Sequence, residues 1–133
     1  MAIESNICNF GWKALDFKLK SIDDKDYALK DLIGTNGTLI MFICNHCPYV
    51  KAVAKKISFE TKQLKALNIN SIAIMSNDTS EYPEDSFNNM KLFAEKNKFE
   101  FPYLIDETQE VAKKYKAQCT PDFFGFNKNL ELH

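Results

Sequence analysis

The sequence has 133 residues, of which 45% are hydrophobic and 13% aromatic, so it can form one domain with a substantial core but not two ordinary domains. Charged residues make up 26% of the chain and the net charge is −1. This balance argues against disorder and against a nucleic-acid-binding surface, which requires a basic excess. All 17 basic residues are lysine, so the chain offers no guanidinium group for bidentate binding of an anion.

The N-terminal segment shows no clear hydrophobic period, and we expect residues 1–12 to form a loose arm in front of a single domain at 13–133. The segment lacks a basic region followed by an apolar stretch. We therefore expect a cytoplasmic protein, although a periplasmic protein with its signal removed would look the same. The longest wholly apolar run, Leu39–Cys44, is far shorter than a bilayer span, so we expect no membrane association.

The remaining chain alternates between predicted strands and helices. Period-two alternation or short apolar runs indicate strands, and apolar residues three and four apart indicate helices. In chain order they predict a strand near 17–19, a buried strand at 38–43, a helix over 50–64, a buried strand at 71–75, a helix from about 85, a short strand at 101–105, a short helix at 108–116 and a hairpin of 122–126 with 130–132. This alternation implies an α/β fold, with the hairpin adding antiparallel strands to the edge of a mixed sheet.

A Cys-x-x-Cys motif, Cys44–Cys47, lies between the buried strand at 38–43 and the following helix. The spacing lets the two thiols close a disulfide with little backbone movement, and a helix N-terminus stabilises a nearby thiolate. We therefore expect a redox-active dithiol in which Cys44 attacks and Cys47 resolves, with a pKa for Cys44 clearly below the ordinary value of about 8.5. His46, when protonated, is expected to favour the Cys44 thiolate further and to make the pair relatively oxidising.

The order of strand, Cys-x-x-Cys and helix, followed by Tyr115–Phe124, resembles the thioredoxin fold. In that family a cis-proline packs against the dithiol, and Pro121 occupies the matching position. The resemblance implies a cis Thr120–Pro121 bond, with Thr120 offering its backbone to a bound substrate chain. Cys119, next to this proline, is either a third redox thiol that faces the site or a small buried hydrophobe.

More narrowly, Phe42–Val50 together with Cys119–Phe124 is similar to the peroxiredoxin-like group of the alkyl hydroperoxide reductase/thiol-specific antioxidant family. The likeness covers roughly residues 11–132. Members of this group continue with a closing helix, so we expect a thioredoxin-like domain that is short at its C-terminus. The resemblance implies a thiol–disulfide oxidoreductase without an organic cofactor or a metal, whose partners are protein or small-molecule thiols and disulfides.

Thioredoxins also place a buried carboxylate near their second cysteine, six residues before the first. That position is Thr38 in this chain, so no general base is evident there, and Asp122 is the nearest candidate by analogy with the fold. Cys8 lies in the expected N-terminal arm and is interpreted as a free thiol without a role.

Three alternatives stay open. In the Pro-x-x-x-Thr-x-x-Cys motif of peroxiredoxins, Cys47 takes the position of the peroxidatic cysteine, although Ile40 and Cys44 replace the proline and the threonine and no arginine is available. A thiol peroxidase is thus the first alternative. The second is a zinc or Cu(I) site formed by thiolates and an imidazole, from Cys44, His46, Cys47 and Cys119. The third is an inactive thioredoxin-fold binding module.

Overall fold

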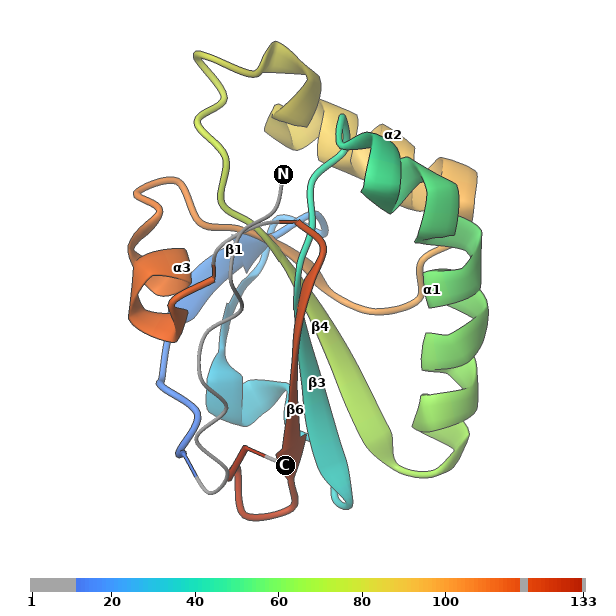
Figure 1. Ribbon diagram of the computed structural model, residues 1–133, viewed down its shortest axis with the longest axis vertical. Helices are drawn as coiled ribbons and strands as arrows, with labels where there is room; N and C mark the ends of the chain where they lie inside the picture. The colour runs from blue at the N-terminus through green and yellow to red at the C-terminus, as the bar shows by residue number, and fades with distance from the viewer. Residues whose placement is uncertain (1–11, 118–119, 133) are drawn as a thin grey trace.

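The computed structural model describes residues 12–117 and 120–132, which form a six-stranded sheet with helices on both faces (Figure 1). The strands are β1 (Lys18–Ser21), β2 (Asp26–Ala28), β3 (Gly37–Phe42), β4 (Ile69–Met75), β5 (Tyr103–Ile105) and β6 (Asp122–Asn127). The α-helices in the described ranges are α1 (Pro48–Ala66), α2 (Phe87–Asn97) and α3 (Glu110–Tyr115), and the 3₁₀ helices are η1 (Leu29–Asp31) and η2 (Pro83–Asp85).

The sheet has the strand order β2-β1-β5-β4-β3-β6 and is mixed. β4 lies at its centre and pairs in parallel with both β3 and β5. β6 pairs antiparallel with β3, and β1 pairs antiparallel with β5. Parallel neighbours need a crossover connection, and α1 provides it between β3 and β4. This connection places the end of β3 and the start of α1 at the same edge of the sheet.

Two apolar clusters fill the two faces of the sheet. Side chains alternate along β3, so that Met41 packs on the side of α1 and α2 while Ile40 and Phe42 pack on the side of α3. Figure 1 shows the same division, with α1 and α2 on one side of the sheet and α3 on the other. Because β3 and β4 are covered on both faces, each has a nearly continuous apolar sequence.

The predicted α/β fold is confirmed, with a mixed sheet flanked by helices. Two details differ from the sequence prediction. β2 was not predicted, because this three-residue edge strand is largely polar and is defined by its pairing with β1. The second arm of the C-terminal hairpin is present only as isolated bridges, in which Leu132 pairs with Phe126 and Glu131 pairs with Lys13.

Trp12, the last residue of the expected N-terminal arm, is partly buried and packs against the apolar cluster on the α3 side of the sheet. Its ring lies 5.5 Å from that of Tyr115 in an edge-to-face arrangement, and 6.2 Å from that of Phe126. The expectations for residues 1–11, including Cys8, and for Cys119 lie outside the residues that the structure describes. No helix in the described ranges has the length and apolar composition needed to span a bilayer.

Candidate active site

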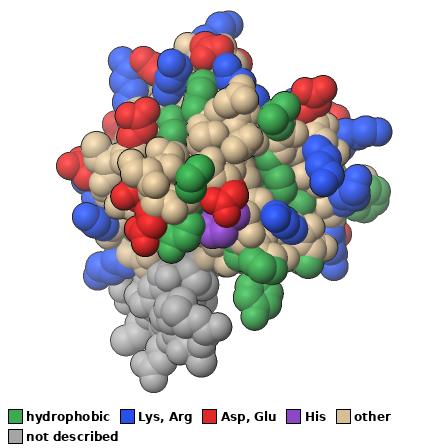
Figure 2. All heavy atoms as spheres, turned by 90° about the horizontal axis from the view of Figure 1, so that it is seen from above, with side chains coloured by type: hydrophobic (Ala, Val, Ile, Leu, Met, Phe, Trp, Pro, Cys, Tyr) green, Lys and Arg blue, Asp and Glu red, His purple; other side chains and the backbone are tan. Residues whose placement is uncertain are grey.

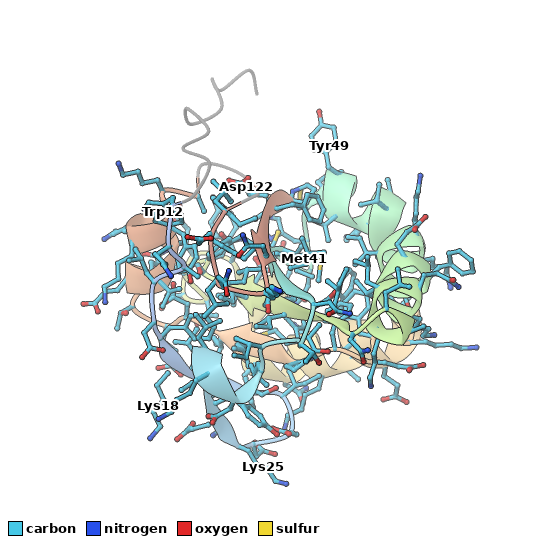
Figure 3. All side chains as sticks on the ribbon, turned by 90° about the horizontal axis from the view of Figure 1, so that it is seen from below. Trp12, Lys18, Lys25, Met41, Tyr49 and Asp122 are labelled. Carbon is cyan, nitrogen blue, oxygen red and sulfur yellow. The ribbon has the colours of Figure 1, made fainter. Side chains whose placement is uncertain are left out.

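The dithiol motif occupies the turn between β3 and α1. Cys44 follows the end of β3 closely, whereas Cys47 is the N-cap residue of α1, which begins at Pro48. Proline suits this first helical position because its backbone has no N–H that would need a partner. Tyr49 is 68% exposed and projects away from the body of the protein at the start of α1 (Figure 3). The helix therefore begins immediately after Cys47 and directs its N-terminal N–H groups to that residue.

Thr120 contacts both cysteine sulfurs from a distant part of the sequence. Its hydroxyl oxygen lies 3.4 Å from Sγ of Cys44, and its carbonyl oxygen accepts a hydrogen bond of 3.4 Å from the Cys47 thiol. The Thr120–Pro121 peptide bond is cis, as the resemblance implies. The strand that follows holds this segment in place, because Asp122 at the start of β6 pairs with the last residue of β3.

The two thiols have contrasting surroundings. Cys44 is only 1% exposed, and burial raises the pKa of its thiol, with a smaller lowering contribution from the Thr120 hydroxyl and a smaller raising contribution from the Asp85 carboxylate. Cys47 is partly exposed. Its partial burial acts to raise its pKa, but hydrogen bonds outweigh this effect, first among them the one from the backbone N–H of Val50, so the pKa of Cys47 is lowered.

The expectation that Cys44 has the low pKa is therefore wrong. The physical reason is burial, which raises the pKa of Cys44 more than the Thr120 hydroxyl and the backbone N–H of Cys47 lower it. The N–H groups of Tyr49 and Val50 at the start of α1 act on Cys47 and lower its pKa. His46, expected to favour the Cys44 thiolate, directs its Nδ1 to a carboxylate oxygen of Asp85. The positive charge that a protonated His46 would bring is thus paired with a negative charge at the same place.

Asp85 is a fully buried carboxylate beside the motif. Its Oδ1 accepts hydrogen bonds from the backbone N–H groups of Asn45, at 2.7 Å, and of His46, at 3.2 Å. Its Oδ2 accepts hydrogen bonds from Nδ1 of His46 and from the side-chain amide of Asn77, at 2.9 Å. These four donors satisfy both oxygens, so Asp85 fixes the backbone and the side chain of the loop that carries the two cysteines.

Two aromatic side chains complete the support of this loop. The ring of Tyr82 stacks on His46 with a centroid distance of 4.7 Å and an interplanar angle of 7°. The buried hydroxyl of Tyr103 donates a hydrogen bond of 2.8 Å to the side chain of Asn45. The sequence analysis identified neither tyrosine and did not identify Asp85. Asp122, its candidate base, lies at the start of β6, and Asp85 from η2 is a carboxylate that contacts the motif.

Cys44, His46 and Asp85 also form the only group of three potential metal-ligating side chains that the described part of the chain brings together, with donor atoms within 4.8 Å of one another. Asp85 accepts four hydrogen bonds, one of them from His46, so a metal ion would have to displace at least one of these donors. The observed arrangement is that of a hydrogen-bonded network.

A cavity of about 540 Å³ opens beside the motif. Its lining includes Phe42, His46, Ser76, Tyr82, Lys113 and Thr120. The side chain of His46 is 27% exposed, and Figure 2 shows a histidine at the surface of this face with acidic and hydrophobic side chains close by. A substrate in this cavity would therefore meet the imidazole ring on one side and Thr120 on another.

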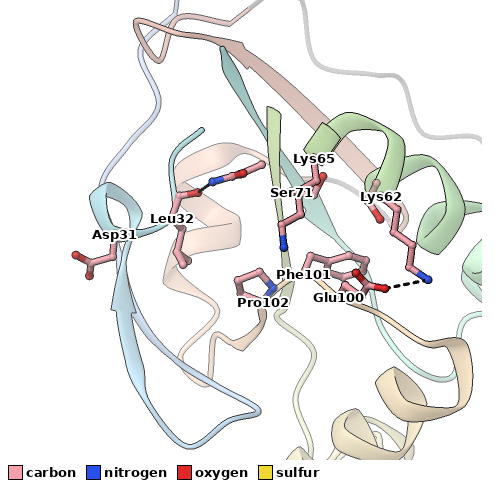
Figure 4. A pocket seen from close by; sticks show the side chains of 10 residues that line it. Asp31, Leu32, Lys62, Lys65, Ser71, Glu100, Phe101 and Pro102 are labelled. Carbon is pink, nitrogen blue, oxygen red and sulfur yellow. Dashed lines mark hydrogen bonds and ion pairs between the residues drawn. The ribbon is translucent and has the colours of Figure 1, made fainter. Parts of the chain in front are cut away.

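A separate pocket of about 270 Å³ lies at the opposite ends of β4 and α1 (Figure 4). Lys62 and Glu100 form an ion pair of 3.2 Å at its rim, and the buried hydroxyl of Ser71 lines it without a hydrogen-bond partner among the described residues. Its lining contains neither cysteine nor histidine, so nothing connects this pocket with the redox chemistry of the dithiol.

The arrangement of strands and helices, with a cis-proline segment against a Cys-x-x-Cys motif, is a thioredoxin-like fold of the kind found in thiol–disulfide oxidoreductases. The family model for the AhpC/TSA family matches residues 10–132, and the chain belongs to this family. No curated protein matches the sequence at a significant level.

Solved structures agree with this assignment. An uncharacterized conserved protein from Geobacillus kaustophilus is 45% identical, with a TM-score of 0.94 over 98% of this chain and 69% of its own. A hypothetical protein from Sinorhizobium meliloti is 31% identical, with a TM-score of 0.92 over 96% of this chain and 69% of its own. A secreted disulfide oxidoreductase from Mycobacterium tuberculosis shares the fold at 15% identity, with a TM-score of 0.74 over 88% of this chain and 80% of its own.

Proposed function

We propose that the protein catalyses thiol–disulfide exchange, with Cys47 as the attacking thiolate and Cys44 as the resolving thiol. The Cys47 thiolate attacks a substrate disulfide, one substrate sulfur leaves as a thiolate, and a mixed disulfide forms on Cys47. Cys44 then loses its proton, attacks the Cys47 sulfur and releases the second substrate thiolate, which leaves a Cys44–Cys47 disulfide. A protein thiol or a small thiol reduces this disulfide and completes the cycle.

The observation that carries this proposal is the asymmetry of the two thiols around Thr120. The reactive species in exchange is the thiolate, and of the two cysteines that the structure describes only Cys47 combines partial exposure with a lowered pKa. Cys44 is buried, but it contacts Cys47 and so can attack a disulfide formed there. Thr120 contacts both sulfurs and is joined to Pro121 by a cis bond, and we assign these two residues to binding of the substrate.

Trapping of the mixed disulfide tests the order of attack. In a background with Cys8 and Cys119 replaced by serine, we compare Cys44→Ser with Cys47→Ser after addition of 5,5′-dithiobis(2-nitrobenzoate). We expect Cys44→Ser to accumulate a stable adduct on Cys47, measured by intact mass, because the resolving thiol is missing. Cys47→Ser should react far more slowly. A faster adduct on Cys44 would reverse the assigned order, and no adduct on either cysteine would contradict the proposed function.

Reduction of hydroperoxides is a second candidate, because the low-pKa Cys47 occupies the peroxidatic position of the family motif. In this reaction the Cys47 thiolate takes one oxygen from the hydroperoxide, an alcohol leaves with a solvent proton, and Cys47 becomes a sulfenic acid. Cys44 then condenses with it to form the disulfide and water. The same Cys44→Ser variant separates the candidates, since rapid sulfenic acid formation without a disulfide adduct would favour the peroxidase.

A further inference from the structure

The resolving step needs a proton acceptor next to a buried sulfur. Cys44 is 1% exposed, and burial raises the pKa of its thiol, so this thiol keeps its proton at neutral pH. It must nevertheless become a thiolate before it can attack the mixed disulfide on Cys47. A group within the protein that accepts the proton would therefore control the rate of this step.

The structure places His46 within range of this proton. A ring nitrogen of His46 and a carboxylate oxygen of Asp85 both lie within 4.8 Å of Sγ of Cys44, a distance that one water molecule can bridge. Asp85 is fully buried, and three amide N–H groups together with Nδ1 of His46 occupy its oxygens. A carboxylate that carries no proton can only accept hydrogen bonds, and with such an acceptor Nδ1 of His46 is the donor and Nε2 keeps its lone pair.

We propose that His46 is the acid–base catalyst of the resolving step and that Asp85 is its positioning residue. This inference rests on the proposed thiol–disulfide exchange. The Cys44 proton passes through one bridging water molecule to the imidazole of His46, the Cys44 thiolate attacks the Cys47 sulfur, and the sulfur–sulfur bond to the substrate breaks. The imidazolium, at the border of the cavity, then returns the proton to the departing substrate thiolate. Asp85 stabilises the imidazolium and holds the ring in one orientation.

The other ionisable groups around the ring are less suited to accept the proton. Those facing it are Cys47 on its own loop, Tyr82 and Asp85 on the segment before α2, Tyr103 on β5, and Lys113 on α3. The oxygens of Asp85 already accept four hydrogen bonds. The Tyr103 hydroxyl donates a hydrogen bond to the side chain of Asn45, so its proton is directed to that residue. A lysine ammonium group has no lone pair, and Tyr82 stacks on the face of the ring.

Stopped-flow measurements with 5,5′-dithiobis(2-nitrobenzoate) resolve the two steps, because each releases one coloured thiolate. All variants carry serine at positions 8 and 119. His46→Asn retains an amide donor in place of Nδ1 but lacks the second nitrogen, and Asp85→Asn removes the charge of the positioning residue. Asp106→Asn is the matched control, since Asp106 is another buried carboxylate, bonded to Ser76 at 2.8 Å and located outside the dithiol site.

We expect the first phase to keep its rate in every variant, because these substitutions leave unchanged the backbone N–H groups at the start of α1 that lower the pKa of Cys47. The second phase should slow about 100-fold at pH 7 in His46→Asn and Asp85→Asn, as is typical for the loss of general acid–base catalysis. The difference from the parent protein should shrink as the pH rises, because hydroxide then removes the Cys44 proton in all variants. A merely structural defect would instead slow the second phase by the same factor at every pH. Asp106→Asn should retain both phases.

Several outcomes would overturn the inference. A second phase of wild-type rate in His46→Asn would show that the ring accepts no proton, and a slowed phase without alkaline recovery would show that the ring only supports the loop. His46 is half-buried, so His46→Asn keeps the test valid even if Asp85→Asn fails to fold. Absence of the first phase in the parent protein would instead contradict the proposed function itself.

Discussion

The sulfur atoms of Cys44 and Cys47 come from one short loop but lie in different electrostatic surroundings. The N-terminus of α1 and its backbone N–H groups favour the thiolate of Cys47, whereas burial and the charge of Asp85 disfavour that of Cys44. The residue types and the spacing of the motif do not reveal which of the two cysteines has the lower pKa. That difference depends on the burial of Cys44 and on the residue at which α1 begins.

The pH dependence of alkylation measures this difference directly. Because the thiolate is the reactive form, a lowered pKa shifts the rise in rate to lower pH, and a raised pKa shifts it to higher pH. We expect Cys47 in the Cys44→Ser variant to react with iodoacetamide at a lower pH than free cysteine does. Cys44 in the Cys47→Ser variant should require a higher pH. Coincident pH profiles would contradict the assigned asymmetry.

At this scale the sequence predicts part of the site. The two cysteines and Thr120 were identified from a spacing rule and a family resemblance, and the structure brings them into contact. Asp85 could not be singled out, because it is one of 18 acidic residues and lies next to a polar loop. Its significance comes from burial and from partners about 40 positions away in the chain, neither of which has a local sequence signal.

Helix α2 and the turn before it form the element that presents Asp85 to the dithiol loop. Ser86 is the N-cap of α2, and its side chain accepts a hydrogen bond from the backbone N–H of Asn89. Ser86→Ala should therefore lower the free energy of unfolding by about 1 kcal/mol, measured by urea denaturation. Ser80→Ala, at an exposed position of the same loop, is the control and should have little effect. Equal effects of the two substitutions would contradict the capping role.

Elements with strong periodicity were predicted well, and short ones were not. β3 and β4 are long apolar runs, and their predicted positions agree with the structure to within a few residues. The η2 turn was not predicted as a separate element, because a single 3₁₀ turn buries too few residues to create a period. The start of α1 was predicted correctly in outline, but the N-cap at Cys47 depends on the local geometry of Pro48.

On the scale of the whole molecule, stability depends on the two apolar clusters that enclose the sheet. Met41 is fully buried in the cluster below α1 and α2, close to the end of β3 that carries the dithiol. Met41→Ala should reduce the free energy of unfolding by about 2–5 kcal/mol, because a cavity remains where the side chain was. Leu92→Ala, at a position that is 56% exposed, should cost much less. Similar losses in denaturant titrations of both variants would contradict this description of the core.

The pairing of β6 with β3 has a consequence for a chain that is still being synthesised. Thr120, which contacts both sulfurs, lies 76 positions after Cys44 and reaches them through the strand that follows it. A ribosome therefore releases both cysteines long before their threonine partner. From residue 47 to residue 120 the nascent polypeptide carries two thiols without this threonine, so the site is complete only when the start of the edge strand has been added.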